Sequence, residues 1–275
     1  MSVTFGDDPT QRFSARAGAY ARARPGYPDA AVAALVHALA LTDGATIVDL
    51  GCGTGLSSEA FLRAGCRVIG VEPNEAMRQH AARLREQQPR FTLVNGRAEA
   101  TSLDAACADL VIAAQAFHWF DVKATRAEAL RILRQPPLAA LLWNDRRTQG
   151  SEFARGYEEL LVRYGTDYLE VQRRHERADR IEQFFGNNQW QTISVTHDTP
   201  LDFDSLADRL NSASYAPASS DSRYRPMMQS LRELFLATER DGMVAMEFET
   251  RIHFGQIRPD GTGQPWQAPA TAQPS

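Results

Sequence analysis

Cysteine is scarce in this sequence, and its positions argue against two kinds of site. Cys52, Cys66 and Cys107 are the three cysteines of a 275-residue chain, and no two of them form a CxxC pair. Disulfide frameworks and zinc sites usually need closely spaced or paired cysteines. We therefore expect reduced thiols, no bound metal and a cytoplasmic protein.

Long apolar runs and long basic runs are also missing. The longest nearly apolar stretch, residues 30–41, contains His37 and is shorter than the roughly 20 residues of a membrane span. Residues 1–8 are polar and acidic, which does not fit a signal peptide. The chain has 30 Lys+Arg against 34 Asp+Glu, a balance that argues mildly against a phosphate-backbone binder. We expect neither a membrane nor a nucleic acid as a partner.

What the sequence does contain is a regular alternation of strand and helix patterns. Short runs typical of buried strands are predicted at residues 46–50, 67–71, 91–94, 110–113 and 138–143. Four helices are predicted alongside these strands. The first starts after Asp29, its expected N-cap, and the others cover residues 56–64, a segment from Asn74, and residues 122–133. This βαβα order predicts a parallel sheet with helices on both faces.

The pattern changes after Asn144. Residues 151–186 are charged and helical, with an apolar stripe that indicates core packing. Two more strands are predicted at 190–196 and 244–254, with helices near 204–211 and 223–238. The tail, residues 259–275, is rich in Pro, Gln, Gly and Thr and is predicted to be disordered.

A glycine-rich turn follows the first predicted strand. Gly51, Gly53 and Gly55 are spaced as GxGxG and not as the GxGxxG of dinucleotide-binding proteins. Glycines are needed where the backbone turns tightly and a ligand approaches it closely. Asp49 stands two residues before the first glycine, where a carboxylate would repel a pyrophosphate but suits an ammonium group.

Two further acids follow the next strands. Glu72 ends the second strand, where it is placed to accept hydrogen bonds from both hydroxyls of a ribose. Ala98 and Glu99 come after the third strand, where a backbone N–H and a carboxylate can read an adenine edge. Alternatively, Glu99 is an acidic side chain in a solvent-exposed loop and binds no ligand.

Together, these residues resemble the motifs of a known family. Residues 49–55, Glu72 and Ala98–Glu99 resemble the class I S-adenosylmethionine-dependent methyltransferases, and Gln115–Phe120 is similar to the small-molecule, trans-aconitate-methyltransferase-like or Methyltransf_11 group. The resemblance implies a Rossmann-like α/β fold: a seven-stranded, mostly parallel sheet with an antiparallel last strand, plus a helical cap. It suggests a single domain over residues 1–258, with the lid or cap formed by residues 1–30 and 145–235.

The resemblance also implies a cofactor site for S-adenosylmethionine. Asp49 and the glycine turn would hold its methionine end, Glu72 its ribose, and the segment around Glu99 its adenine. Met77 would pack on the adenine face, or alternatively in the core of its helix. The expected cofactor-binding residues are Asp49, Gly51, Cys52, Gly53, Gly55, Glu72, Pro73, Met77, Ala98, Glu99, Gln115 and Ala116.

The methyl acceptor is expected beyond the fourth strand. His118 is a candidate base if the acceptor is a hydroxyl or an amine, and otherwise a structural or orienting residue. The aromatic side chains around it would either wall the acceptor pocket or pack in the core. The candidate wall and lid residues are Tyr20, Arg24, Tyr27, Phe117, Trp119 and Phe120.

One departure from the family pattern and two rival functions complete the hypothesis. Residues 133–138, Leu-Arg-Gln-Pro-Pro-Leu, replace the family's usual Pro-Gly-Gly turn before the fifth strand. An NAD-dependent dehydrogenase is the nearest rival enzyme, and a catalytically inactive methyltransferase-fold binding subunit is the rival from another class. We expect a small-molecule acceptor, whose identity no motif specifies.

Overall fold

Seven strands form one mixed sheet in the computed structural model, which describes residues 26–169, 178–186, 190–213 and 215–258. The order across the sheet is β3-β2-β1-β4-β5-β7-β6. The strands are β1 (Thr46–Leu50), β2 (Arg67–Val71), β3 (Phe91–Val94), β4 (Ala108–Ala114), β5 (Leu133–Arg146), β6 (Gln191–Leu201) and β7 (Val244–Gln256). The strands from β3 to β5 are parallel, whereas β7 is antiparallel to both β5 and β6. The predicted Rossmann-like fold with its antiparallel last strand is confirmed.

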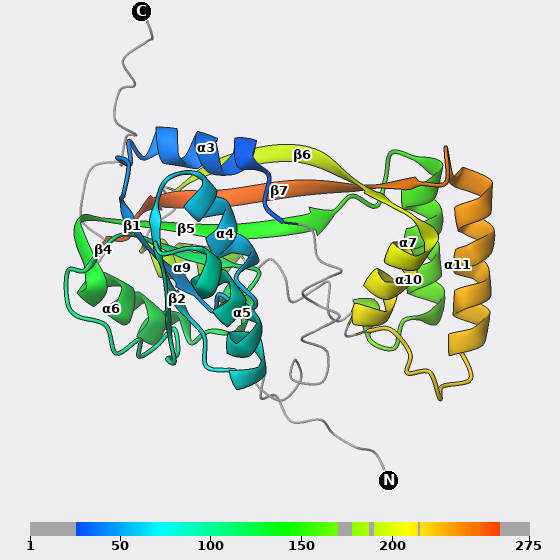
Figure 1. Ribbon diagram of the computed structural model, residues 1–275, viewed down its shortest axis with the longest axis horizontal. Helices are drawn as coiled ribbons and strands as arrows, with labels where there is room; N and C mark the ends of the chain where they lie inside the picture. Colours follow the sequence, from blue (N-terminus) through cyan, green and yellow to red (C-terminus); the bar gives the residue numbers. More distant parts are fainter. Residues whose placement is uncertain (1–25, 170–177, 187–189, 214, 259–275) are drawn as a thin grey trace, which may run out of the picture.

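Helices cover both faces of the sheet because successive strand residues point to opposite sides. On β5, Ala140 and Leu142 belong to one core, and Leu141 and Trp143 belong to the other. The first core is closed by α3 (Asp29–Ala38), α4 (Leu56–Arg63) and α5 (Glu75–Gln87). The second is closed by α6 (Val122–Ile132) and α9 (Ala178–Phe185), and Figure 1 shows α3 and α6 on opposite sides of the sheet.

The helix starts follow from capping chemistry, with one correction. The side chains of Asn74 and Asp121 cap α5 and α6 by accepting hydrogen bonds from backbone N–H groups three residues later. The prediction that Asp29 caps α3 is wrong, because Pro28 occupies the N-cap. Asp29 is the first helical residue, and its carboxylate accepts a 2.8 Å hydrogen bond from Arg63.

A second group of helices lies at one end of the sheet (Figure 1). It consists of α7 (Glu152–Tyr164), α10 (Phe203–Ser212) and α11 (Tyr224–Thr238). β6 and β7 are 11 and 13 residues long, against 5 for β1, and the extra length carries Met246 and Phe248 into a third core among these helices. The apolar stripe predicted in α7 packs in this core. The role of this helical group as a cap stays a prediction.

Several boundaries differ from the expected ones. Residues 133–138 are the first part of β5, where the pairing jumps from Ala108↔Leu133 to Leu110↔Leu138 and the surplus residues bulge. β6 continues to Leu201, beyond the predicted end at residue 196.

Within the described ranges, no helix is long and apolar enough to cross a membrane. The N-terminal segment with Tyr20 and Arg24, and the tail 259–275, lie outside the described residues.

Candidate functional site

The glycine-rich turn follows β1 at the carboxyl edge of the parallel strands. Gly51, Gly53 and Gly55 have φ angles of +67°, +57° and +92°, a region that residues with a side chain rarely adopt. A Cβ on Gly51 would lie 2.9 Å from the Cβ of Ala116, so this glycine lets the turn pack against the segment after β4. A Cβ on Gly53 would meet no atom within 4 Å. The turn therefore leaves open space at Gly53.

Asp49 is completely buried beneath this turn. Its Oδ2 atom accepts hydrogen bonds from the hydroxyls of Ser57 and Ser58, at 2.6 and 2.7 Å. Its Oδ1 atom is shielded from solvent and accepts a hydrogen bond from none of the described residues. Burial raises the pKa of Asp49 to about 6, although the two serine hydrogen bonds act against the rise. Within the described part of the chain, Asp49 thus has one acceptor atom that forms no hydrogen bond.

Glu72 joins the turn after β1 to the turn after β2. Its carboxylate accepts hydrogen bonds from the backbone N–H groups of Gly53 at 2.9 Å and Asn74 at 2.8 Å. Burial is the main cause that raises its pKa, and these two hydrogen bonds oppose it. The neighbouring Pro73 is half-buried, and the thiol of Cys52 is buried with a pKa well above its ordinary value. The Cys52 thiol is therefore protonated and unsuited to act as a nucleophile.

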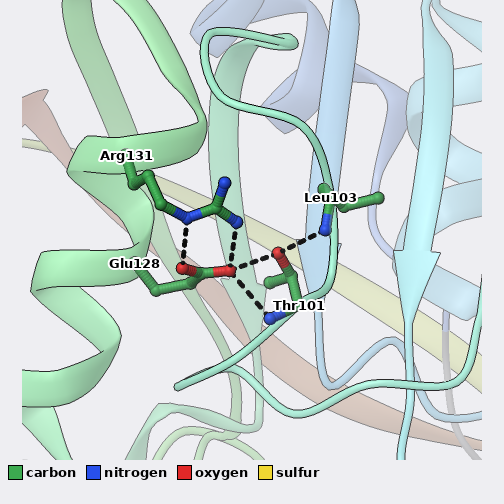
Figure 2. A network of polar contacts seen from close by, with 4 residues as sticks. All are labelled: Thr101, Leu103, Glu128 and Arg131. Carbon is green, nitrogen blue, oxygen red and sulfur yellow. Dashed lines mark hydrogen bonds and ion pairs between the residues drawn. The ribbon is translucent and has the colours of Figure 1, made fainter.

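The loop that carries Ala98 and Glu99 is tied to α6, as Figure 2 shows. The backbone N–H of Thr101 donates to Glu128 at 2.8 Å, and its hydroxyl donates to the same oxygen. Arg131 donates to both carboxylate oxygens of Glu128 at 2.7 Å, and this hydrogen bonding lowers the pKa of Glu128 to about 2. Glu128 therefore stays ionised at any ordinary pH and fixes the loop. Glu99 itself accepts a 2.9 Å hydrogen bond from the N–H of Asp121.

The segment after β4 turns sharply and then forms the short 3-10 helix η1 (Phe117–Trp119). Gln115 has a φ of +54°, and its side-chain amide donates to the carbonyl of Asn144 on β5 at 2.8 Å. The ring of His118 lies 4.8 Å from that of Trp119, and both residues are half-buried. This turn stands next to the glycine turn because Ala116 packs on Gly51.

Comparison with known proteins shows what this part of the chain is similar to. Residues 48–137 match the family model described as a methyltransferase domain. An uncharacterised methyltransferase of Mycobacterium tuberculosis is 35% identical over 139 residues, which are 50% of this chain and 54% of that protein. Residues 48–137 therefore resemble a methyltransferase domain. The chain spans about half the length of these curated relatives.

Solved structures of methyltransferases have the same fold. One from Anaeromyxobacter dehalogenans, described as a type II methyltransferase, is 26% identical, with a TM-score of 0.63 over 86% of this chain and 99% of that one. A second, from Anabaena variabilis and described as belonging to an antibiotic biosynthesis pathway, is 19% identical with a TM-score of 0.57, over 84% of this chain and 98% of that one. The second likeness supports the fold alone. The placement of the chain in the trans-aconitate group stays a prediction.

Phe117, Tyr27 and Met77, which are all expected site residues, are buried. Phe117 is 2% exposed, and its ring makes edge contacts with Trp143 and Phe184. This position corrects the interpretation of Phe117 as a wall of the acceptor pocket and supports core packing. Tyr27 packs in the core with α3, and its role as a lid residue stays a prediction. Met77 is buried on α5, where both of its proposed roles stay open.

The structure adds one residue to the candidate site that no motif marks. Arg180 on α9 donates a 2.7 Å hydrogen bond to the carbonyl of Phe120, and its guanidinium lies 5.7 Å from the ring centroid of Phe117. It therefore holds the turn that presents His118. Arg180 is 60 residues from Phe120 in the sequence, so local patterns carry no signal for this contact.

Proposed function

We propose that the chain is an S-adenosylmethionine-dependent methyltransferase that passes a methyl group directly to a small-molecule acceptor. The proposal is carried by the buried Oδ1 of Asp49, which has no hydrogen-bond partner among the described residues and precedes the glycine turn by two residues. A buried acceptor atom left without a hydrogen bond is unfavourable unless a ligand completes it. The ammonium group of a methionine moiety has the charge and the donors that this oxygen needs.

The remaining residues of the edge fit the other parts of the cofactor. Glu72 has unused lone pairs for ribose hydroxyls, because each of its oxygens accepts one backbone hydrogen bond. The buried Ala98 and the loop with Glu99, which accepts a hydrogen bond from Asp121, would receive the adenine ring. The cofactor supplies a methyl group on a positively charged sulfur.

The acceptor side needs alignment and, for some acceptors, a base. The acceptor atom forms a bond to the methyl carbon while the carbon–sulfur bond breaks, and the electron pair of that bond stays on sulfur. If the acceptor is a hydroxyl or an amine, its proton passes to the imidazole of His118. The protein otherwise orients the reactants and excludes water.

Binding of the demethylated product tests the proposal. Isothermal titration calorimetry of the full chain should show micromolar binding of S-adenosylhomocysteine and no response to NAD. Micromolar NAD binding without S-adenosylhomocysteine binding would favour the dehydrogenase and overturn the proposal. Cofactor binding without transfer to any acceptor, in assays with labelled S-adenosylmethionine and a metabolite panel, would favour a binding subunit.

The raised pKa of Asp49 predicts a pH dependence of this binding. The ammonium group binds the ionised carboxylate, and in the ligand-free protein Asp49 is ionised only above a pH of about 6. The affinity for S-adenosylhomocysteine should be constant above a pH of about 7 and fall about tenfold per pH unit well below 6. Calorimetry between pH 5 and 8 measures this. Asp49→Asn should bind more weakly and lose the dependence, and an unchanged wild-type affinity at pH 5 would contradict the role of Asp49.

A further inference from the structure

The short turn at residues 97–100, which carries Ala98 and Glu99, is closed at its base. Its first and last residues exchange two backbone hydrogen bonds, of 3.3 and 3.1 Å. Directly behind them, a Cβ on Gly96 would lie 3.0 Å from the carbonyl oxygen of Thr101, so the two ends of the turn are in close contact. A turn closed in this way keeps its shape, and the position of Thr101 therefore sets the position of the whole turn.

One side chain of α6 fixes Thr101. Thr101 is completely buried, and its backbone N–H and its hydroxyl both donate to Oε1 of Glu128, at 2.8 and 2.5 Å (Figure 2). The side chain of Glu128 is 10% exposed, and Arg131 keeps it ionised by donating to both of its oxygens. Hydrogen bonds to an ionised acceptor are stronger than those between neutral groups. Glu128 thus holds the end of the turn through both donors of Thr101.

The backbone next to Thr101 is strained. Ser102 has a φ of +62°, a conformation that residues with a side chain rarely adopt. The N–H of Leu103, on the other side of Ser102, donates to the hydroxyl of Thr101 at 3.3 Å. Strain of this kind persists only where surrounding contacts fix the backbone. The hydrogen bonds from Thr101 to Glu128 are such contacts, so the loss of this carboxylate would let the backbone at Ser102 relax and the turn shift.

α6 also holds the tip of the same turn. The carboxylate of Glu99 accepts a 2.9 Å hydrogen bond from the backbone N–H of Asp121, whose side chain caps α6. Asp121 and Glu128 are about two helical turns apart, at roughly 3.6 residues per turn. The 97–100 turn is therefore fixed to α6 at two points, its tip and its end.

Accurate placement of this turn matters for one property of the proposed cofactor site, its preference for adenine. An adenine edge presents an amino donor beside a ring-nitrogen acceptor, and these groups match a carboxylate and a backbone N–H. Hypoxanthine reverses both groups, since it has a carbonyl oxygen and a ring N–H at these positions. Hydrogen bonds weaken steeply outside a narrow range of distances and angles. The turn therefore selects adenine only when its backbone and its carboxylate are both well placed.

We propose that Glu128 is a positioning residue of the cofactor site, which places the 97–100 turn so that it binds adenine and rejects hypoxanthine. This inference rests on the proposed function. Glu128 does not contact the base itself and acts through Thr101. The base selectivity of the site is then determined by α6 as well as by the residues that contact the base.

Calorimetric titrations of the full chain with S-adenosylhomocysteine and S-inosylhomocysteine, its hypoxanthine analogue, test the proposal. The wild type should bind S-adenosylhomocysteine about 100-fold more tightly or better. Glu128→Ala should lower the affinity for S-adenosylhomocysteine roughly tenfold or more and leave that for S-inosylhomocysteine within about twofold. Its preference for adenine therefore falls. A loss of stability alone would lower the melting temperature and leave this preference unchanged.

Arg131→Gln is the matched control, because it removes the same ion pair from the same helix and leaves both hydrogen bonds of Thr101 to Glu128. Without Arg131 the pKa of Glu128 rises toward its ordinary range, so titrations at pH 8 keep the carboxylate ionised. The preference of this variant for adenine should stay within about twofold of the wild type, because exposed ion pairs contribute little. An equal fall in both variants would show that the ion pair only supports the fold, and would overturn the proposal.

Two conservative variants extend the test and replace Glu128→Ala should it fail to fold. Thr101→Val keeps the shape of Thr101 and removes its hydroxyl, so the preference for adenine should fall severalfold. Glu128→Gln keeps an oxygen acceptor for Thr101 but no charge, and its preference should fall by a smaller factor than in Glu128→Ala. A wild-type preference in both folded variants would contradict the role of Glu128.

The outcomes distinguish the two proposals. If the wild type binds S-adenosylhomocysteine and S-inosylhomocysteine equally, the inference about Glu128 is overturned and the proposed function stands. A folded Glu128→Ala protein that retains the wild-type preference also overturns it. If S-adenosylhomocysteine does not bind the wild type, both proposals fail.

Discussion

Gly53→Val should lower the affinity for S-adenosylhomocysteine at least 100-fold in a protein that still folds. Gly53 has a φ of +57°, and nothing lies within 4 Å of the position its Cβ would take. A branched side chain would fill the space proposed for the methionine moiety and would resist this backbone conformation. Calorimetry measures the affinity, and circular dichroism checks the fold.

Gly44→Val is the matched control for this variant. Gly44 also has a positive φ, +76°, and its Cβ would also meet nothing within 4 Å, but it precedes β1 at the amino end of the sheet. Both substitutions should introduce a similar backbone strain of about 1–3 kcal/mol in the folded state. Only Gly53→Val should lose the ligand. Equal affinities in the two folded variants would place the cofactor elsewhere.

His118→Gln should lower kcat by roughly 10²–10⁴-fold if the acceptor atom is a hydroxyl or an amine. Arg180 fixes the turn that carries His118, and Asp49 and Glu72 lie on other turns, so S-adenosylhomocysteine affinity should stay within twofold. The wild-type rate should rise with pH over the range where imidazoles lose their proton, about pH 5–8. The variant should lose this rise. Initial rates across pH measure both effects once an acceptor is known.

The control for His118 is a histidine away from the site. His37 is exposed near the end of α3, and His37→Gln should leave kcat unchanged. If His118→Gln changes KM and not kcat, and the pH dependence is absent, the imidazole orients the acceptor and is not a base. In that case the protein promotes methyl transfer by aligning the reactants, without a general base.

The sequence by itself determined the parallel half of the sheet and the turns at its edge. β1, β2 and β3 begin and end at the predicted residues, since short β-branched runs between turn residues define buried strands locally. The glycine turn, Asp49 and Glu72 were also predicted, because GxGxG and an acid after a strand impose their geometry within a few residues. Neighbouring parallel strands then bring these acids to one edge, as Glu72 shows by its hydrogen bond to Gly53.

Only the tertiary structure decided the contacts that join distant parts of the chain. Phe117 belongs to the core because Phe184 of α9 packs against it, a partner that no local pattern specifies. Arg180 reaches the carbonyl of Phe120 from α9, and the ion pair of Arg146 with Glu158 forms where β5 meets α7. Periodicity shows which face of an element is apolar, but not which element covers it. Those contacts depend on how whole helices pack on the sheet. This packing decided which polar groups of the described residues form hydrogen bonds and which, like Oδ1 of Asp49, do not.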